Sequence, residues 1–153
     1  MNDADFLRYA FRDNQAAIDF VRLIHDIAHL WDDLIDGDKD VSPAQINRAF
    51  FDALVGIPSN PFFRSCSDAL LPVMAASCFN YQIANELQTT GDGESLAIAH
   101  VLRYSVADVL VHVAFLLGGH EWVTQVGPEI RRRAQRDTFE NFLNEMRGKH
   151  EAA

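Results

Sequence analysis

One segment constrains the fold more than any other part of this chain, because residues 20–36 distribute polar and apolar side chains with the period of an α-helix. With successive residues placed about 100° apart, the polar side chains fall within one arc of roughly 140°. They are Arg22, His25, Asp26, His29, Asp32, Asp33 and Asp36. The rest of the circle is almost wholly apolar, so we predict an amphipathic helix over residues 15–36 with one face in the core. Gly37 should end it, because glycine readily adopts the left-handed conformation found after helices.

The rest of the chain also carries helical patterns, and no segment shows the period-two alternation of a strand. We therefore predict an all-α fold, a single-domain helical bundle of about five helices that covers residues 1–153. The predicted helices span residues 15–36, 43–55, 61–88, 94–117 and 128–147, with a short helix or leading turns over 4–12.

Short sequence motifs predict where the helices in the first half of the chain begin and end. Asp13-Asn14 marks a break or a new helix cap. Ser42-Pro43-Ala44-Gln45 is typical of a capping box with proline in the first helical position, and Asn60-Pro61 repeats the cap-then-proline signal. Gly56 with Pro58 should end the helix that begins after Ser42.

Proline and glycine residues also predict where helices bend or end in the second half of the chain. Pro72 should bend or divide the helix over residues 61–88. Residues 94–117 are apolar on most sides, which predicts the most buried helix of the bundle. Gly118-Gly119 should stop that helix.

Composition narrows the classes of partner. The net charge of −9 at pH 7 argues against nucleic acid or an anionic membrane as the main partner, because both attract basic surfaces. The first residues lack the pattern of a signal peptide, and no apolar run approaches the length of a bilayer span. We therefore predict a cytoplasmic protein without membrane association. Cys66 and Cys78 have no C-x-x-C spacing, which favours two reduced, packed thiols.

The end of the predicted helix over residues 15–36 carries an electrostatic problem. Asp32, Asp33 and Asp36 crowd the last turn, where backbone carbonyls already carry partial negative charge. Each carboxylate there should cost about 0.3–1 kcal/mol. A divalent cation would reverse the sign of that interaction, and hard cations such as Mg²⁺ prefer oxygen ligands. The pattern thus predicts a site for Mg²⁺ or Mn²⁺, while a solvated acidic face explains the same residues without a metal.

Other polar residues could extend such a site. His25 and His29 are four residues apart and could chelate a softer metal such as Zn²⁺ or Fe²⁺. Asp108 and His112 lie at helical spacing amid apolar neighbours, either as an ion pair or as a line that faces the aspartates across the bundle. In the second interpretation Asp108 is an opposing ligand and His112 a general base. Arg132 and Arg136, in the basic cluster of residues 131–136, are then candidates for phosphate binding.

Two short stretches resemble parts of one enzyme family. Asp32-Asp33-Leu34-Ile35-Asp36 resembles the D-D-x-x-D motif of class I isoprenoid and terpenoid synthases, an all-α family. The resemblance implies that these aspartates bind Mg²⁺ that bridges a substrate diphosphate. Tyr104-Ser-Val-Ala-Asp108 and the residues up to Gly119 are loosely similar to a buried helix of the squalene and phytoene synthase branch.

Two further resemblances point to overlapping residues. Leu23-Ile24-His25-Asp26, together with Ala107-Asp108, is similar to the HD-domain phosphohydrolases, which would make His25, Asp26 and Asp108 metal ligands. Asp36, Asp38 and Asp40 alternate between two predicted helices as in an EF-hand loop.

Taken together, the residues predict a small helical-bundle protein that binds a divalent metal through an aspartate-rich helix end, for phosphate or diphosphate chemistry on a phosphorylated small molecule. The competing prediction is a non-enzymatic interaction or assembly protein, whose acidic helix face is solvated or meets a basic partner. A homo-oligomer is compatible with both. The sequence does not decide whether the protein is an enzyme.

Overall fold

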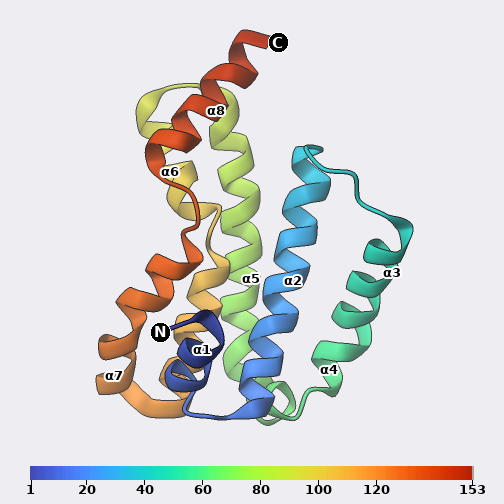
Figure 1. Cartoon of the computed structure of the whole chain (residues 1–153), viewed down its shortest axis with the longest axis vertical. Coiled ribbons are helices and arrows are strands. Elements are labelled where there is room, and N and C mark those ends of the chain that lie inside the picture. Colours follow the sequence, from blue (N-terminus) through green and yellow to red (C-terminus); the bar gives the residue numbers. More distant parts are fainter. Residues whose placement is uncertain (153) are drawn as a thin grey trace. The chain divides into compact units, whose positions relative to one another are not determined.

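A computed structural model describes residues 1–152 of the chain (Figure 1). Every regular element among these residues is a helix, and none is a strand, which confirms the all-α prediction. The chain divides into two compact units, Met1–Leu70 and Leu71–Ala153, which are described in turn. The assignment of residues 1–153 to a single domain stays a prediction.

The first unit is built around α2 (Gln15–Asp36), which has the predicted bounds. It is preceded by α1 (Asp3–Ala10) and followed by α3 (Pro43–Phe51). The Asn14 side chain caps α2 by accepting a hydrogen bond from the Ala17 backbone N–H at 3.0 Å, and Gly37 ends the helix with a φ of 67°. The predicted capping box of Ser42 and Gln45 is present at the start of α3. These predictions are confirmed because each depends on neighbouring residues alone.

The helix after Ser42 does not stop at Gly56, so that prediction is wrong. The chain continues through a π-helical turn, η1 (Asp52–Gly56), into the short α4 (Ile57–Ser59). Gly56 keeps an ordinary right-handed helical conformation, with φ −59° and ψ −52°. Pro58 has no N–H to donate to the preceding turn, and the wider π-helical turn lets the helix pass it without that hydrogen bond.

The core of the first unit lies toward the N-terminal half of α2. Its buried apolar side chains are Phe6, Ala10, Phe11, Ala17, Ile18, Phe20, Val21, Ile57, Phe62 and Leu70. Phe20 packs against the rings of Phe62 and Phe63, with centroids 6.1 and 5.8 Å away. These contacts fix the start of α5 (Pro61–Thr90) against α2.

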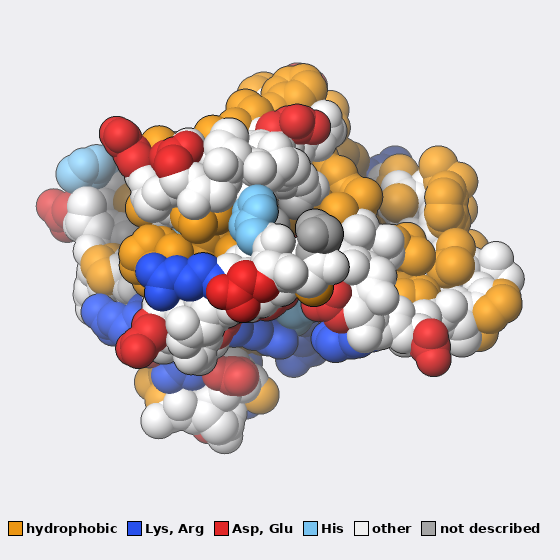
Figure 2. All heavy atoms as spheres, turned by 90° about the horizontal axis from the view of Figure 1, so that it is seen from above, with side chains coloured by type: hydrophobic (Ala, Val, Ile, Leu, Met, Phe, Trp, Pro, Cys, Tyr) orange, Lys and Arg blue, Asp and Glu red, His pale blue; other side chains and the backbone are white. Residues whose placement is uncertain are grey.

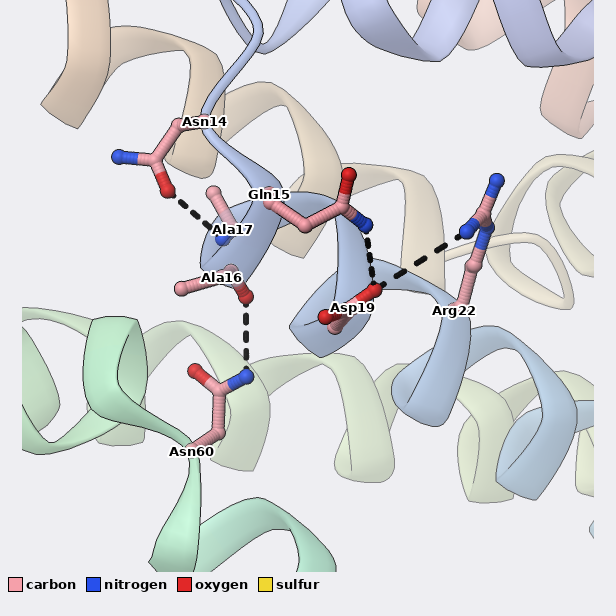
Figure 3. Close-up of polar contacts among 7 residues, drawn as sticks. All are labelled: Asn14, Gln15, Ala16, Ala17, Asp19, Arg22 and Asn60. Carbon is pink, nitrogen blue, oxygen red and sulfur yellow. Dashed lines mark hydrogen bonds and ion pairs between the residues drawn. The ribbon is translucent and has the colours of Figure 1, made fainter.

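Asn60 joins the same two helices through polar contacts (Figure 3). Its side chain is buried, with Nδ2 donating to the Ala16 carbonyl at 2.9 Å and Oδ1 accepting from the Phe63 N–H at 3.0 Å. The amide therefore caps α5 and ties that cap to the first turn of α2. Asn60 was predicted as a cap, but its bond to Ala16 depends on tertiary structure and could not be predicted.

The backbone of α5 departs from helical geometry at Cys66, with φ −142° and ψ 28°, and not at Pro72. The Phe62 carbonyl accepts hydrogen bonds from the Ser65 hydroxyl at 2.7 Å and from the Cys66 thiol at 3.1 Å. Short side chains that compete for a helix carbonyl in this way weaken the local helix. A break was predicted in this region, but at the wrong residue.

The second unit contains the rest of α5, then α6 (Gly93–Leu102), α7 (Val106–Ala134) and α8 (Phe139–Ala152). The single helix predicted over residues 94–117 is therefore wrong, because the chain turns at residues 103–105. The Ser105 hydroxyl donates to the Leu102 carbonyl at 2.6 Å, and the Ser105 N–H donates to the same oxygen at 3.0 Å. Such bonding to the preceding carbonyl stabilises a turn at the expense of a continuous helix.

The helix predicted over residues 128–147 is also wrong. Pro128 lies inside α7, and the chain leaves helical structure after Ala134 before α8 begins. The Thr138 hydroxyl accepts the Asn141 N–H at 3.1 Å and so caps α8. The predicted stop at Gly118-Gly119 is confirmed as a sharp break within α7, where Gly119 has φ 78° and ψ −171°.

The second unit has a core of its own between α5, α6 and α8. It consists of Ala84, Leu96, Ala99, Phe142 and Met146, with Leu87, Leu102 and Leu143 packed against them. Along α7, Val109 and Val113 are buried as expected. Residues 94–117 were predicted to form the most buried helix, but three of their large apolar side chains are 42–55% exposed: Ile98, Val101 and Phe115.

Candidate functional site

The polar face of α2 brings two predicted metal ligands into contact. The Nε2 atoms of His25 and His29 lie 3.1 Å apart, and the two rings meet edge to face with centroids separated by 4.3 Å. Residues four apart on a helix share a face, which places both imidazoles on one side of α2. Both side chains are half-buried, and His25 Nδ1 lies 3.4 Å from an Asp26 carboxylate oxygen. The pair can share one proton or direct two nitrogens at one ion.

Asp33 has a basic neighbour that the sequence did not predict. Lys39 Nζ lies 3.2 Å from Asp33 Oδ1, and the Gly37 N–H donates to the Asp33 backbone carbonyl at 3.1 Å. The turn after α2 therefore folds its one lysine back onto the end of the helix. This ammonium supplies part of the positive charge that we had assigned to a metal.

Asp36 forms a second group with Asp38 at the end of α2. Carboxylate oxygens of Asp36 and Asp38 lie within 4.8 Å of each other. Asp32 is half-buried on the same helix, and Asp40, the third aspartate of the EF-hand-like stretch, is exposed. Within residues 1–70, the structure thus shows a histidine pair and an aspartate pair, and does not gather the five predicted ligands within one 4.8 Å group.

Asp108 and His112 lie on α7 in the second unit, and the structure gives Asp108 a different partner from the predicted one. Arg131 Nη2 donates to Asp108 Oδ1, and Arg131 Nη1 lies 3.5 Å from the Tyr104 carbonyl. The contact closes because the break at Gly119 brings the second half of α7 back toward the first. His112 instead places its ring against Phe115, with centroids 5.7 Å apart. The ion pair of Asp108 with His112 is therefore replaced by one with Arg131.

The basic cluster proposed for phosphate binding is largely matched by acidic side chains. Arg132 and Arg133 both donate to the Glu129 carboxylate, the second at 2.8 Å. The hydrogen bond from Arg133 lowers the pKa of Glu129 below its ordinary value, and the charge of Arg132 acts in the same direction. Arg136 lies exposed after the end of α7. Arg132 therefore already has an anionic partner on its own helix.

Sequence reasoning missed the main polar residue of the second unit, His100. It is 7% exposed on α6, and its Nε2 lies 3.0 Å from the Asp137 carbonyl. The Gln135 amide donates to the His100 backbone carbonyl at 3.1 Å, and the imidazole packs against Phe142 with centroids 5.1 Å apart. These bonds close the turn between α7 and α8 onto α6, so the role of His100 is structural. A lone histidine in an apolar stretch gave no signal of it.

A second missed group is Asp52, which is 6% exposed inside η1. Arg48 Nε donates to its carboxylate at 3.0 Å. The spacing of four residues was visible in the sequence, but the burial was not, because it follows from the π-helical turn.

Comparisons with protein-family models, with curated proteins and with solved structures give no match for this chain. The resemblances to class I synthases and HD-domain phosphohydrolases accordingly stay predictions from short motifs.

One stretch of the described chain, Val106–Ala152, is long and apolar enough by composition to cross a membrane. The break at Gly119 leaves about 13 residues of continuous helix before it, or about 20 Å. The hydrocarbon core of a bilayer is about 30 Å thick, so this helix alone is too short to span it. The cytoplasmic location stays a prediction.

Proposed function

We propose that the polar face of α2 binds a divalent cation. The observation that supports the proposal best is the 3.1 Å separation of the His25 and His29 Nε2 atoms, on the same helix face as Asp32, Asp33 and Asp36. Two nitrogens about 2.1 Å from one metal ion, at an angle of roughly 90–110°, are about 3.0–3.4 Å apart. The imidazoles therefore already have the spacing of two ligands that share an ion.

The charge of the segment supports the same function. Between His25 and Asp40 the chain has six aspartates and one lysine, and that lysine is placed beside Asp33. A divalent cation would compensate carboxylates at the negative end of the α2 dipole. Carboxylates favour Mg²⁺ or Mn²⁺, whereas the two imidazoles favour Zn²⁺ or Fe²⁺. The identity of the preferred ion therefore indicates whether the carboxylates or the two imidazoles bind it.

A bound cation also provides the route to phosphate chemistry. The D-D-x-x-D resemblance implies that a metal on Asp32 and Asp36 contacts a diphosphate, and a metal there can neutralise phosphate charge. The arginines of the second unit contribute less to this proposal, since Arg131, Arg132 and Arg133 have carboxylate partners. A phosphorylated small molecule is therefore proposed as a ligand of the metal and not of the basic cluster.

Thermal melts in EDTA and in millimolar Mg²⁺, Mn²⁺ or Zn²⁺ test the proposal. A cation at about 100 times its dissociation constant should add about 2.7 kcal/mol to the free energy of unfolding. The double variant His25→Ala/His29→Ala should lose the Zn²⁺ response, and Asp32→Asn/Asp36→Asn should lose the Mg²⁺ and Mn²⁺ response. His120→Ala, which changes an exposed histidine on α7, is the matched control and should keep both responses. Equal midpoints in EDTA and in all three metals would contradict the proposal.

A further inference from the structure

The outer face of α3 and its continuation carries large apolar side chains that no part of the first unit covers. Phe50 is 63% exposed, Phe51 55%, Leu54 73% and Val55 44%. We call these four residues the α3 stripe. Figure 2 shows hydrophobic side chains gathered toward the right of the view, the side on which Figure 1 draws α3.

This exposure is unusual for a helix of a folded domain. α3 has no buried residue, although its sequence is amphipathic, whereas the equally short α1 buries Phe6 and Ala10. Short helices owe most of their stability to burial of an apolar face. Contiguous exposed apolar side chains on a soluble protein mark an interaction surface. The α3 stripe therefore has the character of an interaction surface.

The lack of charge on the α3 stripe narrows the classes of partner that could bind it. Its four residues carry no charge, and the nearest charged groups, Arg48 and Asp52, pair with each other at 3.0 Å. A nucleic acid or an anionic membrane requires a basic footprint, which the stripe lacks. Two molecules of net charge −9 repel each other over most of their surface, and the stripe is a face on which they can meet without bringing carboxylates together.

We propose that the α3 stripe is covered by the same stripe of a second copy of this chain, in an antiparallel contact about a twofold axis near Ala53. Such a contact is self-complementary, as a twofold interface must be. It places Phe50 and Phe51 of one copy against Leu54 and Val55 of the other. Paired faces of this kind bury aromatic and aliphatic side chains at the centre and leave polar residues such as Asn47 at the rim.

The area of the stripe suits a small dimer interface. A phenylalanine buries about 150–250 Å², so two phenylalanines that are more than half exposed, together with Leu54 and Val55, offer roughly 400 Å² per copy. Two copies together bury about 800 Å² of the stripe, less than the roughly 1,000 Å² of a permanent specific interface, so we expect a weak, transient dimer. The dimer should therefore dissociate in the micromolar range.

Sedimentation velocity across about 1–300 µM protein tests the proposal. The wild-type chain of 17.2 kDa should sediment as a monomer at the low end and approach twice that mass at the high end. Phe50→Glu and Leu54→Glu should each weaken dimerisation at least tenfold while the far-ultraviolet circular dichroism is unchanged. Phe79→Glu is the matched control, because Phe79 on α5 is 62% exposed, and it should dimerise like the wild type.

Salt provides a second measurement that needs no variant. Screening of the −9 charge should tighten the dimer several-fold between 50 and 500 mM NaCl, whereas an interface held by ion pairs would weaken. A wild-type chain that stays monomeric up to 300 µM would assign the stripe to another protein and overturn the proposal. A dimer that survives both stripe variants, is lost with Phe79→Glu, or weakens with salt would overturn it as well.

Discussion

The two units treat their charged side chains differently. In the second unit two acidic groups of α7 meet arginines, Asp108 with Arg131 and Glu129 with Arg132 and Arg133. In the first unit the last turn of α2 and the turn after it, residues 32–40, hold five aspartates with one lysine among them. A helix end that gathers like charges is where a cation would stabilise the fold most. The comparison favours α2 over α7 as the functional face.

The two sets also differ in how they are assembled. The polar face of α2 is local, since residues one turn apart on a continuous helix share a side. The contact of Asp108 with Arg131 is not local, because it exists only where the chain reverses at Gly119. A single substitution should therefore disturb the two arrangements to different extents.

The reversal of α7 should be the more fragile of the two arrangements. Gly119 adopts φ 78° and ψ −171°, a region that is essentially restricted to glycine. Gly119→Ala should therefore lower the free energy of unfolding by about 1–3 kcal/mol. Gly127→Ala is the control on the same helix, because its added methyl would meet only the Val123 side chain at 4.0 Å. The control should be neutral or stabilise by up to about 1 kcal/mol. Chemical denaturation of the two variants measures the difference, and equal stabilities would argue against the reversal.

The next prediction concerns the pair that this reversal creates. Asp108 and Arg131 are each about 40% exposed, so their attraction is screened and should contribute about 0.5–1 kcal/mol. A double-mutant cycle of Asp108→Asn with Arg131→Gln should show that coupling. The parallel cycle of Asp108→Asn with His112→Gln should be additive. Coupling to His112 in place of Arg131 would restore the ion pair predicted from the sequence.

The local and the nonlocal parts of the molecule were not equally predictable. The bounds of α2, the Asn14 cap, the Gly37 stop and the capping box at Ser42 were all predicted, because propensity and capping act between neighbours. The turn at Ser105 was missed because the surrounding sequence has a strongly helical pattern, whereas the turn depends on a single hydrogen bond from the Ser105 hydroxyl to the Leu102 carbonyl. The end of α7 was missed because Gln135 and Asp137 are held by His100, which is distant in sequence.

The same division applies to the candidate site. The closeness of His25 and His29 follows from their spacing, and it was predicted as a chelating pair. The contact of Lys39 with Asp33 was missed, since it depends on the path of the turn after Gly37. The partner of Asp108 could not be predicted without knowing that α7 reverses.

The stability of the fold at acidic pH should depend on the pairing of Glu129 with Arg132 and Arg133. Arg133 and Arg132 lower the pKa of Glu129, so this carboxylate stabilises the fold above its unfolded pKa, and the contribution is lost as the pH falls through its lower folded pKa. Glu129→Gln should therefore lose less stability than the wild type between about pH 5 and pH 3. The exposed Glu121→Gln should follow the wild-type curve. The change in stability should be smaller than the coupling energy of the Asp108 cycle. Parallel curves of stability against pH for the wild type and Glu129→Gln would show that ionised Glu129 does not stabilise the fold.

The expected effect of a change at the end of α2 reverses sign with metal. Asp36 is the last residue of the helix, where its negative charge opposes the dipole, so Asp36→Asn should stabilise the metal-free protein by about 0.3–1 kcal/mol. In millimolar Mn²⁺ the same change removes a proposed ligand and should reduce the metal-dependent stabilisation by more than that gain. Asp19→Asn is the matched control, because Asp19 lies toward the other end of the helix and accepts a hydrogen bond from Gln15 at 2.8 Å. It should lose a few tenths of a kcal/mol in either condition. Thermal melts of both variants with EDTA and with Mn²⁺ decide the matter. If Asp36→Asn stabilises equally in both, the end of α2 is a solvated acidic face, and the five aspartates of residues 32–40 serve solubility and not cation binding.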